Sequence, residues 1–206
     1  PLDVVNSNQI EKFPAFKKSL FNLKAVMNNK IIQFNEYKLP DNYIVFDVES
    51  YYNHDFLFGF LDGDEYKPFY LEKGDLKTVT EMINYLDKSK KTLIHYDTHD
   101  TMALKRIGKK YKQFKVQIDN LLKNSYDLYD LISKNFALPV TSYSLKDISK
   151  YFDFKWRTNL NGFAVIIAYS NYIKGNEDNL KQITDYNEDD CRATRLILEK
   201  LREGKF

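Results

Sequence analysis

The sequence of 206 residues lacks several features that would place it in a specialised class of protein. Its one cysteine, Cys191, excludes an internal disulfide framework and fits a reducing compartment, so we expect a cytoplasmic protein. No stretch approaches the roughly 18 consecutive apolar residues of a membrane span, so we expect no membrane partner. Glycine contributes only seven residues and proline five, while 43% of the chain is hydrophobic. This balance predicts a folded globular chain with enough material for a core.

The chain is also poor in net charge and in histidine. A formal charge of +2 is too small to argue for or against a nucleic-acid partner. Three histidines and one cysteine are too few to favour a zinc site built from these ligands. Aromatic residues are abundant by contrast, with 16 tyrosines and 15 phenylalanines. Exposed rings can stack on nucleic-acid bases, although an aromatic-rich core accounts better for the count.

The pattern of apolar residues predicts an α/β domain behind a lead-in segment. Residues 1–40 have weak periodicity and run into a Leu-Pro-Asp-Asn turn signal, so we expect an N-terminal extension or linker before a domain spanning 41–206. Residues 43–50 resemble a buried strand, and two more strands are expected at 56–63 and 65–72. Further elements are expected as a strand at 91–97 and as helices at 75–90, 98–111, 142–152, 161–175 and 179–201. This order predicts a mixed central β-sheet flanked by helices, with a helical C-terminal half.

Two carboxylates lie on the first of these strands, in the stretch YIVFDVES at 43–50. Asp47 and Glu49 are two residues apart and therefore project from the same face of a strand. At about 6 Å they repel each other by roughly 3 kcal/mol at an effective dielectric constant near 20. A bound divalent cation, which prefers oxygen ligands, would offset this repulsion. The alternative is an exposed strand end with two solvated acids.

Four more carboxylates crowd the segment ITDYNEDDCRATRLI at 183–197. Tyr186 and Asp190 are four residues apart, so they share one face of the expected closing helix. A phenol beside a metal-bound carboxylate can hold and orient a water molecule. The alternative is a helix start, where acidic residues are favoured, but apolar Leu180 and Ile183 precede the cluster and weaken that interpretation.

A further acidic residue, Asp100, lies in the first turn of the helix expected at 98–111, within HYDTHDTMALKRI. Its simplest interpretation is an acid near the positive end of the helix. Asp97 lies close by in the sequence and competes with Asp100 for any functional role.

Taken in order, these motifs resemble a known family. FDVES, LIHYDTHDTMALKRI, SYSLKDISKYFDF and YNEDDCRATRLILEKL are similar to motifs of the DnaQ-like 3′→5′ exonucleases, which have an RNase H-like fold, in their tyrosine-bearing (DEDDy) branch. The resemblance covers about 43–202 and extends to the prokaryotic predicted RNase H-like exonuclease domains, which occur alone or joined to RecB-like nuclease and helicase modules. It implies that the domain at 41–206 is an RNase H-like 3′→5′ exonuclease domain.

The resemblance also implies the residues of an active site. The metal ligands would be Asp47, Glu49, Asp100 and Asp190, which would hold two Mg²⁺ or Mn²⁺ ions. We expect these ions to be the positive charge that offsets the acidic segment of the closing helix. Tyr186 would orient the attacking water, and its four-residue spacing selects Asp190 over its neighbour.

One position departs from the family pattern. Where many relatives have an aromatic residue before the second-motif acid, this chain has His99 before Asp100, so the choice between Asp97 and Asp100 stays open.

Several side chains near these motifs are candidates for binding a nucleic-acid strand. Lys146 could contact a phosphate, although it could equally be a solvated helix lysine. Tyr143 and Trp156 could stack on a base, although core packing explains them better, and His95 lies near the second motif. The basic segments 88–91 and 109–115 are expected to be solvated faces.

The resemblance implies hydrolysis of phosphodiester bonds from a 3′ end, with release of nucleoside 5′-monophosphates. It favours single-stranded DNA, because the related modules are joined to DNA-processing partners such as a helicase or a RecB-like nuclease. The alternatives are a 3′→5′ exoribonuclease, a non-catalytic nucleic-acid-binding module on the same fold, and an RNase H-like endonuclease. The spacing of Tyr186 and Asp190 argues against the last of these.

Overall fold

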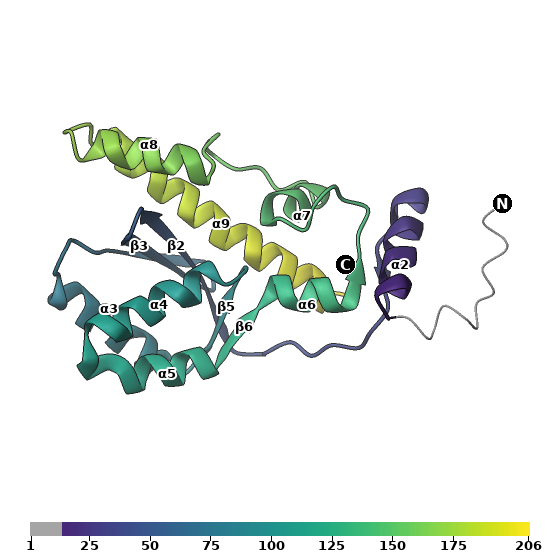
Figure 1. Ribbon diagram of the computed structural model, residues 1–206, viewed down its shortest axis with the longest axis horizontal. Helices are drawn as coiled ribbons and strands as arrows, with labels where there is room; N and C mark the ends of the chain where they lie inside the picture. The colour runs from purple at the N-terminus through teal and green to yellow at the C-terminus, as the bar shows by residue number, and fades with distance from the viewer. Residues whose placement is uncertain (1–13) are drawn as a thin grey trace.

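The computed structural model describes residues 14–206 and contains a five-stranded mixed sheet in the order β4-β3-β2-β5-β6 (Figure 1). Strands β2 (Tyr43–Tyr51), β3 (His54–Asp62) and β4 (Glu65–Tyr70) form an antiparallel meander. Strands β5 (Thr92–His95) and β6 (Ser125–Asp127) continue the sheet in parallel to β2. The predicted mixed sheet is therefore confirmed, with β2 at its centre.

Helices cover both faces of this sheet. One face packs against α3 (Leu76–Ser89), α4 (His99–Lys110) and α5 (Lys115–Lys123), with the short helix η1 (Lys112–Phe114) between the last two. The other face packs against α6 (Leu128–Asn135), α7 (Leu145–Tyr151), α8 (Gly162–Tyr172) and the long closing helix α9 (Asp178–Arg202). Figure 1 shows α9 running across the sheet, with α8 and α7 beside it.

The alternation of side chains along β2 divides the core into two clusters, one on each face of the sheet. Ile44, Phe46 and Val48 pack with α3, α4 and α5, whereas Val45 packs with α6, α7 and α9. Burying an aliphatic or aromatic side chain of this size contributes about 1.5–3 kcal/mol. Because β2 is covered on both faces, the register of its side chains is fixed, and the two carboxylates near its end are fixed with it.

The ends of several helices follow from local sequence. Asp75 and Ser144 accept hydrogen bonds from the backbone N–H groups three residues on, and these caps start α3 and α7. Helix α8 ends at Tyr172, and the turn after it places Gly175 at a φ of +100°, which glycine adopts without strain. The expected helical C-terminal half also contains two short strands that were not predicted, β6 and β7 (Phe136–Ala137). Both are two or three residues long and have no periodicity of their own.

The described part of the lead-in segment packs on the rest of the chain. Helix α2 (Pro14–Asn28) is followed by β1 (Ile32–Gln33), which pairs with β7 in an antiparallel manner. The Tyr37 hydroxyl donates to the backbone oxygen of Leu201 at 2.9 Å, and its ring packs on Phe136. Part of the expectation for 1–40 falls on residues 1–13, which lie outside the described residues, and the boundary at 40 stays a prediction. Within the described chain, no helix combines the length and apolar character needed to cross a bilayer.

These contacts predict a stability difference between two truncated chains. A chain of residues 41–206 should melt more than about 5 °C below a chain of residues 14–206, because it loses the β1–β7 pairing and the packing of Tyr37. Thermal unfolding followed by circular dichroism measures the difference. Equal melting temperatures would mean that the segment 14–40 contributes nothing to stability.

Candidate metal centre

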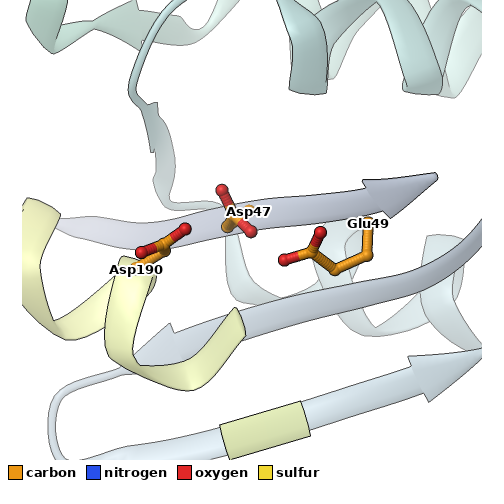
Figure 2. Close-up of side chains that lie close together, drawn as sticks. All are labelled: Asp47, Glu49 and Asp190. Atoms are coloured by element: carbon orange, nitrogen blue, oxygen red, sulfur yellow. The ribbon is translucent and has the colours of Figure 1, made fainter. Parts of the chain in front are cut away.

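Three carboxylates from β2 and α9 converge on one point. One oxygen of each of Asp47, Glu49 and Asp190 lies within 4.8 Å of the others. Figure 2 shows the two strand carboxylates and the helix carboxylate turned toward one another. Glu49 is 7% exposed and Asp190 is 8% exposed, so most of this negative charge is removed from water. The predicted pair on one face of the strand and the predicted acid on α9 therefore meet in space.

Burial raises the pKa values of all three acids, and repulsion within the cluster adds to the shift of the two acids on β2. Burial followed by the charges of Glu49 and Asp190 raises the pKa of Asp47 well above its usual range. Burial and the charge of Asp190 raise the pKa of Glu49 to about 8. Burial raises the pKa of Asp190 to about 6, although a hydrogen bond from Trp156 opposes the shift. A cluster of this kind holds protons at neutral pH unless a cation replaces them.

The donor set fits a hard divalent cation. All three groups offer carboxylate oxygens, which Mg²⁺ and Mn²⁺ prefer. The Oε1 atom of Glu49 is buried and has no hydrogen-bond partner among the described residues. Leaving a buried polar oxygen without a partner is costly, and a cation ligated by this oxygen would remove that cost.

Hydrogen bonds hold two of the carboxylates in place. Asn187 donates from Nδ2 to Asp47 Oδ2 at 2.6 Å, and its own oxygen accepts from the Tyr66 hydroxyl at 2.7 Å. Trp156 donates its indole N–H to Asp190 Oδ1 at 2.6 Å. The sequence pattern assigns no role to Asn187 or Tyr66, although Asn187 lies within the motif YNEDDCRATRLILEKL.

A glycine makes room for this arrangement. A Cβ atom at Gly59 would lie 1.8 Å from Asn187 Oδ1 and 2.6 Å from the Tyr66 hydroxyl. The absence of a side chain on β3 therefore lets Asn187 approach the sheet and reach Asp47. The thiol of Cys191, one residue after Asp190, also faces the Gly59 carbonyl, at 3.7 Å.

Asp100 lies next to the three carboxylates but is not one of them. Its Oδ1 accepts a hydrogen bond from the backbone N–H of Val48 at 3.0 Å, between the two acids of β2. It is 2% exposed, and burial followed by the charge of Asp47 raises its pKa well above the usual range. Asp97 is exposed and accepts from the backbone N–H of Thr98 at 2.6 Å. The geometry thus brings Asp100 rather than Asp97 to β2, and its role as a ligand stays a prediction.

Tyr186 lies one helical turn before Asp190 and is buried. Burial and the neighbouring charge of Asp190 raise the pKa of its phenol, so the hydroxyl keeps its proton at neutral pH. The Nζ atom of Lys146 lies 4.8 Å from the centre of the Tyr186 ring and 5.5 Å from that of Trp156. Its charge is therefore close to the acidic cluster, and burial lowers the pKa of its amine.

Two of the predicted strand-binding residues are placed elsewhere. The Tyr143 hydroxyl accepts from the backbone N–H of Leu138 at 3.0 Å and donates to Asn22 on α2 at 3.0 Å. His95 is buried, and its Nδ1 donates to the Asp97 carbonyl at 2.6 Å. Neither residue is brought to the three carboxylates, and both assignments stay predictions.

Basic side chains, rather than a metal, offset the other acids of α9: Lys181 lies 2.5 Å from Asp185 and Arg192 lies 2.6 Å from Glu188. The Nε atom of Arg157 lies 2.8 Å from Asp189, and its other nitrogens lie 2.9 Å from Glu188 and 3.6 Å from Asp185. The expectation that bound metal is the counter-charge of the whole segment is therefore wrong for these three residues. Side chains at successive helix positions point in different directions. Of the four acids in this segment, Asp190 is therefore the one that faces β2.

The fold and the acidic cluster define a nuclease-type α/β protein, and a comparison with known families agrees. A family model described as the RNase H superfamily matches residues 44–202. Because the match covers more than half of the chain, the protein belongs to the RNase H superfamily and has an RNase H-like fold. Members of this superfamily are generally nucleases that use divalent metals. A search of the curated proteins finds no match to this chain.

The raised pKa of Glu49 predicts how stability depends on pH when metal is absent. Between the usual value of 4.5 and about 8, the native state binds more protons than the unfolded state. Stability should therefore fall as pH rises through this window. Urea unfolding in EDTA from pH 5 to pH 8 should show a decline that is smaller in Glu49→Gln, by on the order of 3 kcal/mol. If stability fell equally with pH in the two proteins, the pKa of Glu49 would not be raised in the native state.

The close approach at Gly59 predicts the effect of one added methyl group. Gly59→Ala should displace Asn187, lower stability by about 1–3 kcal/mol and weaken Mn²⁺ binding measured by calorimetry. Gly108→Ala is the matched control, because its Cβ would lie 3.4 Å from the nearest atom of Ile118. It should change stability by less than about 1 kcal/mol and leave Mn²⁺ binding unaltered. Equal effects of the two substitutions would argue against a role for Gly59 in the site.

Proposed function

We propose that the protein is a metal-dependent 3′→5′ exonuclease that hydrolyses phosphodiester bonds of single-stranded DNA. The observation that carries the proposal is the convergence of Asp47, Glu49 and Asp190, with Tyr186 one turn before Asp190 on the same helix. Buried acids that repel one another favour a divalent cation, and a divalent cation in turn favours a phosphate.

The residues of the cluster have distinct roles in this reaction. Two bound Mg²⁺ or Mn²⁺ ions would lower the pKa of a water molecule and stabilise the charge on the leaving 3′ oxygen. Asp47, Glu49 and Asp190 would hold the cations, and Asp100 would complete the ligand set from the start of α4. Trp156 holds the carboxylate of Asp190 in place through its indole N–H, which would limit the directions from which Asp190 could bind a cation.

Tyr186 positions the attacking water. Its phenol stays protonated and lies beside Asp190, so it can donate or accept a hydrogen bond without adding charge. This arrangement is the one implied by resemblance to the tyrosine-bearing branch of the DnaQ-like exonucleases, and it supports action at a 3′ end rather than endonuclease cleavage.

The choice of substrate follows from the same resemblance. Related domains are joined to DNA-processing modules, so we favour DNA as the substrate and a helicase or RecB-like nuclease module as a partner. RNA is the alternative substrate, since the reaction at phosphorus is the same for both polymers.

A matched pair of substitutions on α9 tests the proposal. Asp190→Asn should slow digestion of 5′-labelled single-stranded DNA about a thousandfold, because it removes a metal ligand worth several kcal/mol of transition-state stabilisation. Asp185→Asn, five residues earlier and bound to Lys181 at 2.5 Å, should digest as the unaltered protein does. Both are assayed with Mg²⁺, with Mn²⁺ and with EDTA.

The products decide between the alternatives. A metal-dependent ladder that shortens from the 3′ end supports the exonuclease, and the same ladder on RNA alone would replace DNA by RNA as the substrate. Internal cuts would indicate an endonuclease. Retained binding of strands without cleavage in any cation would contradict catalysis and leave a binding module.

A further inference from the structure

A basic pocket lies between α7 and the loop that follows it. Its volume is about 410 Å³, and its lining includes Lys146, Lys150 and Lys155 together with the rings of Phe154 and Trp156. The lining residues include no carboxylate, and none of the three lysines forms an ion pair with a described residue. The Lys146 ammonium donates to the Leu160 carbonyl and lies near Asp190, so Lys150 and Lys155 supply most of the positive charge with which this concave surface attracts an anion.

Two side chains connect this pocket to the acidic cluster. Trp156 lines the pocket and also donates its indole N–H to Asp190. Lys146 lines it too, and lies against the ring of Tyr186. A strand whose last phosphodiester bond lies at the cluster would therefore pass directly into the pocket.

The loop that forms the pocket is fixed to α9. The backbone N–H of Arg157 donates to Asp189 at 2.6 Å, and its guanidinium group binds the same carboxylate and Glu188. Figure 1 shows this connection between α7 and α8 running along α9. Because Arg157 is anchored in this way, its neighbour Trp156 is held over Asp190 and presents its ring to the pocket.

A hydroxyl in the same lining lacks a partner. The Oγ1 atom of Thr158 is buried and has no hydrogen-bond partner among the residues that the structure describes.

We propose that this pocket binds the nucleotides next to the 3′ end of a single strand, with lysines on the phosphates and a base stacked on Trp156. The pairing of exposed cations with aromatic rings is the chemistry of single-strand binding, because only an unpaired base offers its face to a ring. The inference rests on the proposed exonuclease function and names the path of its substrate.

A second lysine cluster supplies the matched control. Lys105, Lys109, Lys112 and Lys115 line a pocket of about 190 Å³ at the far end of α4. Lys109 lies nine residues after Asp100, which places it about 14 Å further along the helix. Lys109 and Lys112 are exposed in the control pocket, and Lys150 and Lys155 are exposed in the proposed binding pocket. Replacing either pair therefore removes two charges without disturbing the core.

The experiment measures binding in EDTA, which separates strand binding from hydrolysis. Fluorescein-labelled oligothymidylate and oligouridylate are titrated against the unaltered protein, Lys150→Gln/Lys155→Gln and Lys109→Gln/Lys112→Gln, over a range of salt concentrations. The first pair should weaken binding about tenfold at low salt and reduce the salt slope by about 1.4, as expected for two lost phosphate contacts. The control pair should bind as the unaltered protein does.

Trp156 gives a second readout, since it is the one tryptophan in the chain. Its fluorescence should be quenched when single strands bind, and duplex DNA of the same length should quench it far less. Addition of Mn²⁺ should also alter this fluorescence in both double variants, which shows that the acidic cluster is intact.

Several results would overturn the pocket as the binding site. These are equal weakening by both pairs, weakening by the control pair alone, or tight binding without any quenching of Trp156. If the first pair weakens binding as expected but the unaltered protein digests no strand in any metal, the pocket stands and the exonuclease proposal fails.

Discussion

Three carboxylates lie side by side, two of them buried and Asp47 half-buried, and they constrain the rest of this structure. Asp47, Glu49 and Asp190 each lose water and each repel the other two, so their arrangement costs free energy that the surrounding packing must offset. Strand β2 supplies that packing, since it is central in the sheet and covered by helices on both faces. The polar contacts from Asn187 and Trp156 then fix which way the oxygens point.

Two groups of charged residues lie on different sides of helix α9. On one side, Arg157 binds three of its acids and fastens the loop after α7 to the helix. On the other side, Asp190 faces β2 and shares the cluster. Arg157, Lys181 and Arg192 together balance the three acids that do not face the sheet, and Arg157 also positions Trp156 against the one that does. This explains how one segment tolerates so many carboxylates.

The parts of the site that depend on local geometry could be predicted from sequence. Period-two alternation put Asp47 and Glu49 on one face, and a four-residue spacing selected Asp190. The partners Asn187 and Gly59 could not be found in this way, because they depend on an approach between α9 and β3, more than a hundred residues apart in the chain. Likewise, the three-residue strand β6 exists only through its pairing with β5 and has no pattern of its own.

Anomalous diffraction from crystals grown with Mn²⁺ tests the central claim most directly, because it locates the cation without relying on activity. We expect a peak about 2.1 Å from carboxylate oxygens of Asp47, Glu49 and Asp190. A peak missing from this position at saturating Mn²⁺, with the three carboxylates unmoved, would contradict the account of the cluster as a metal centre.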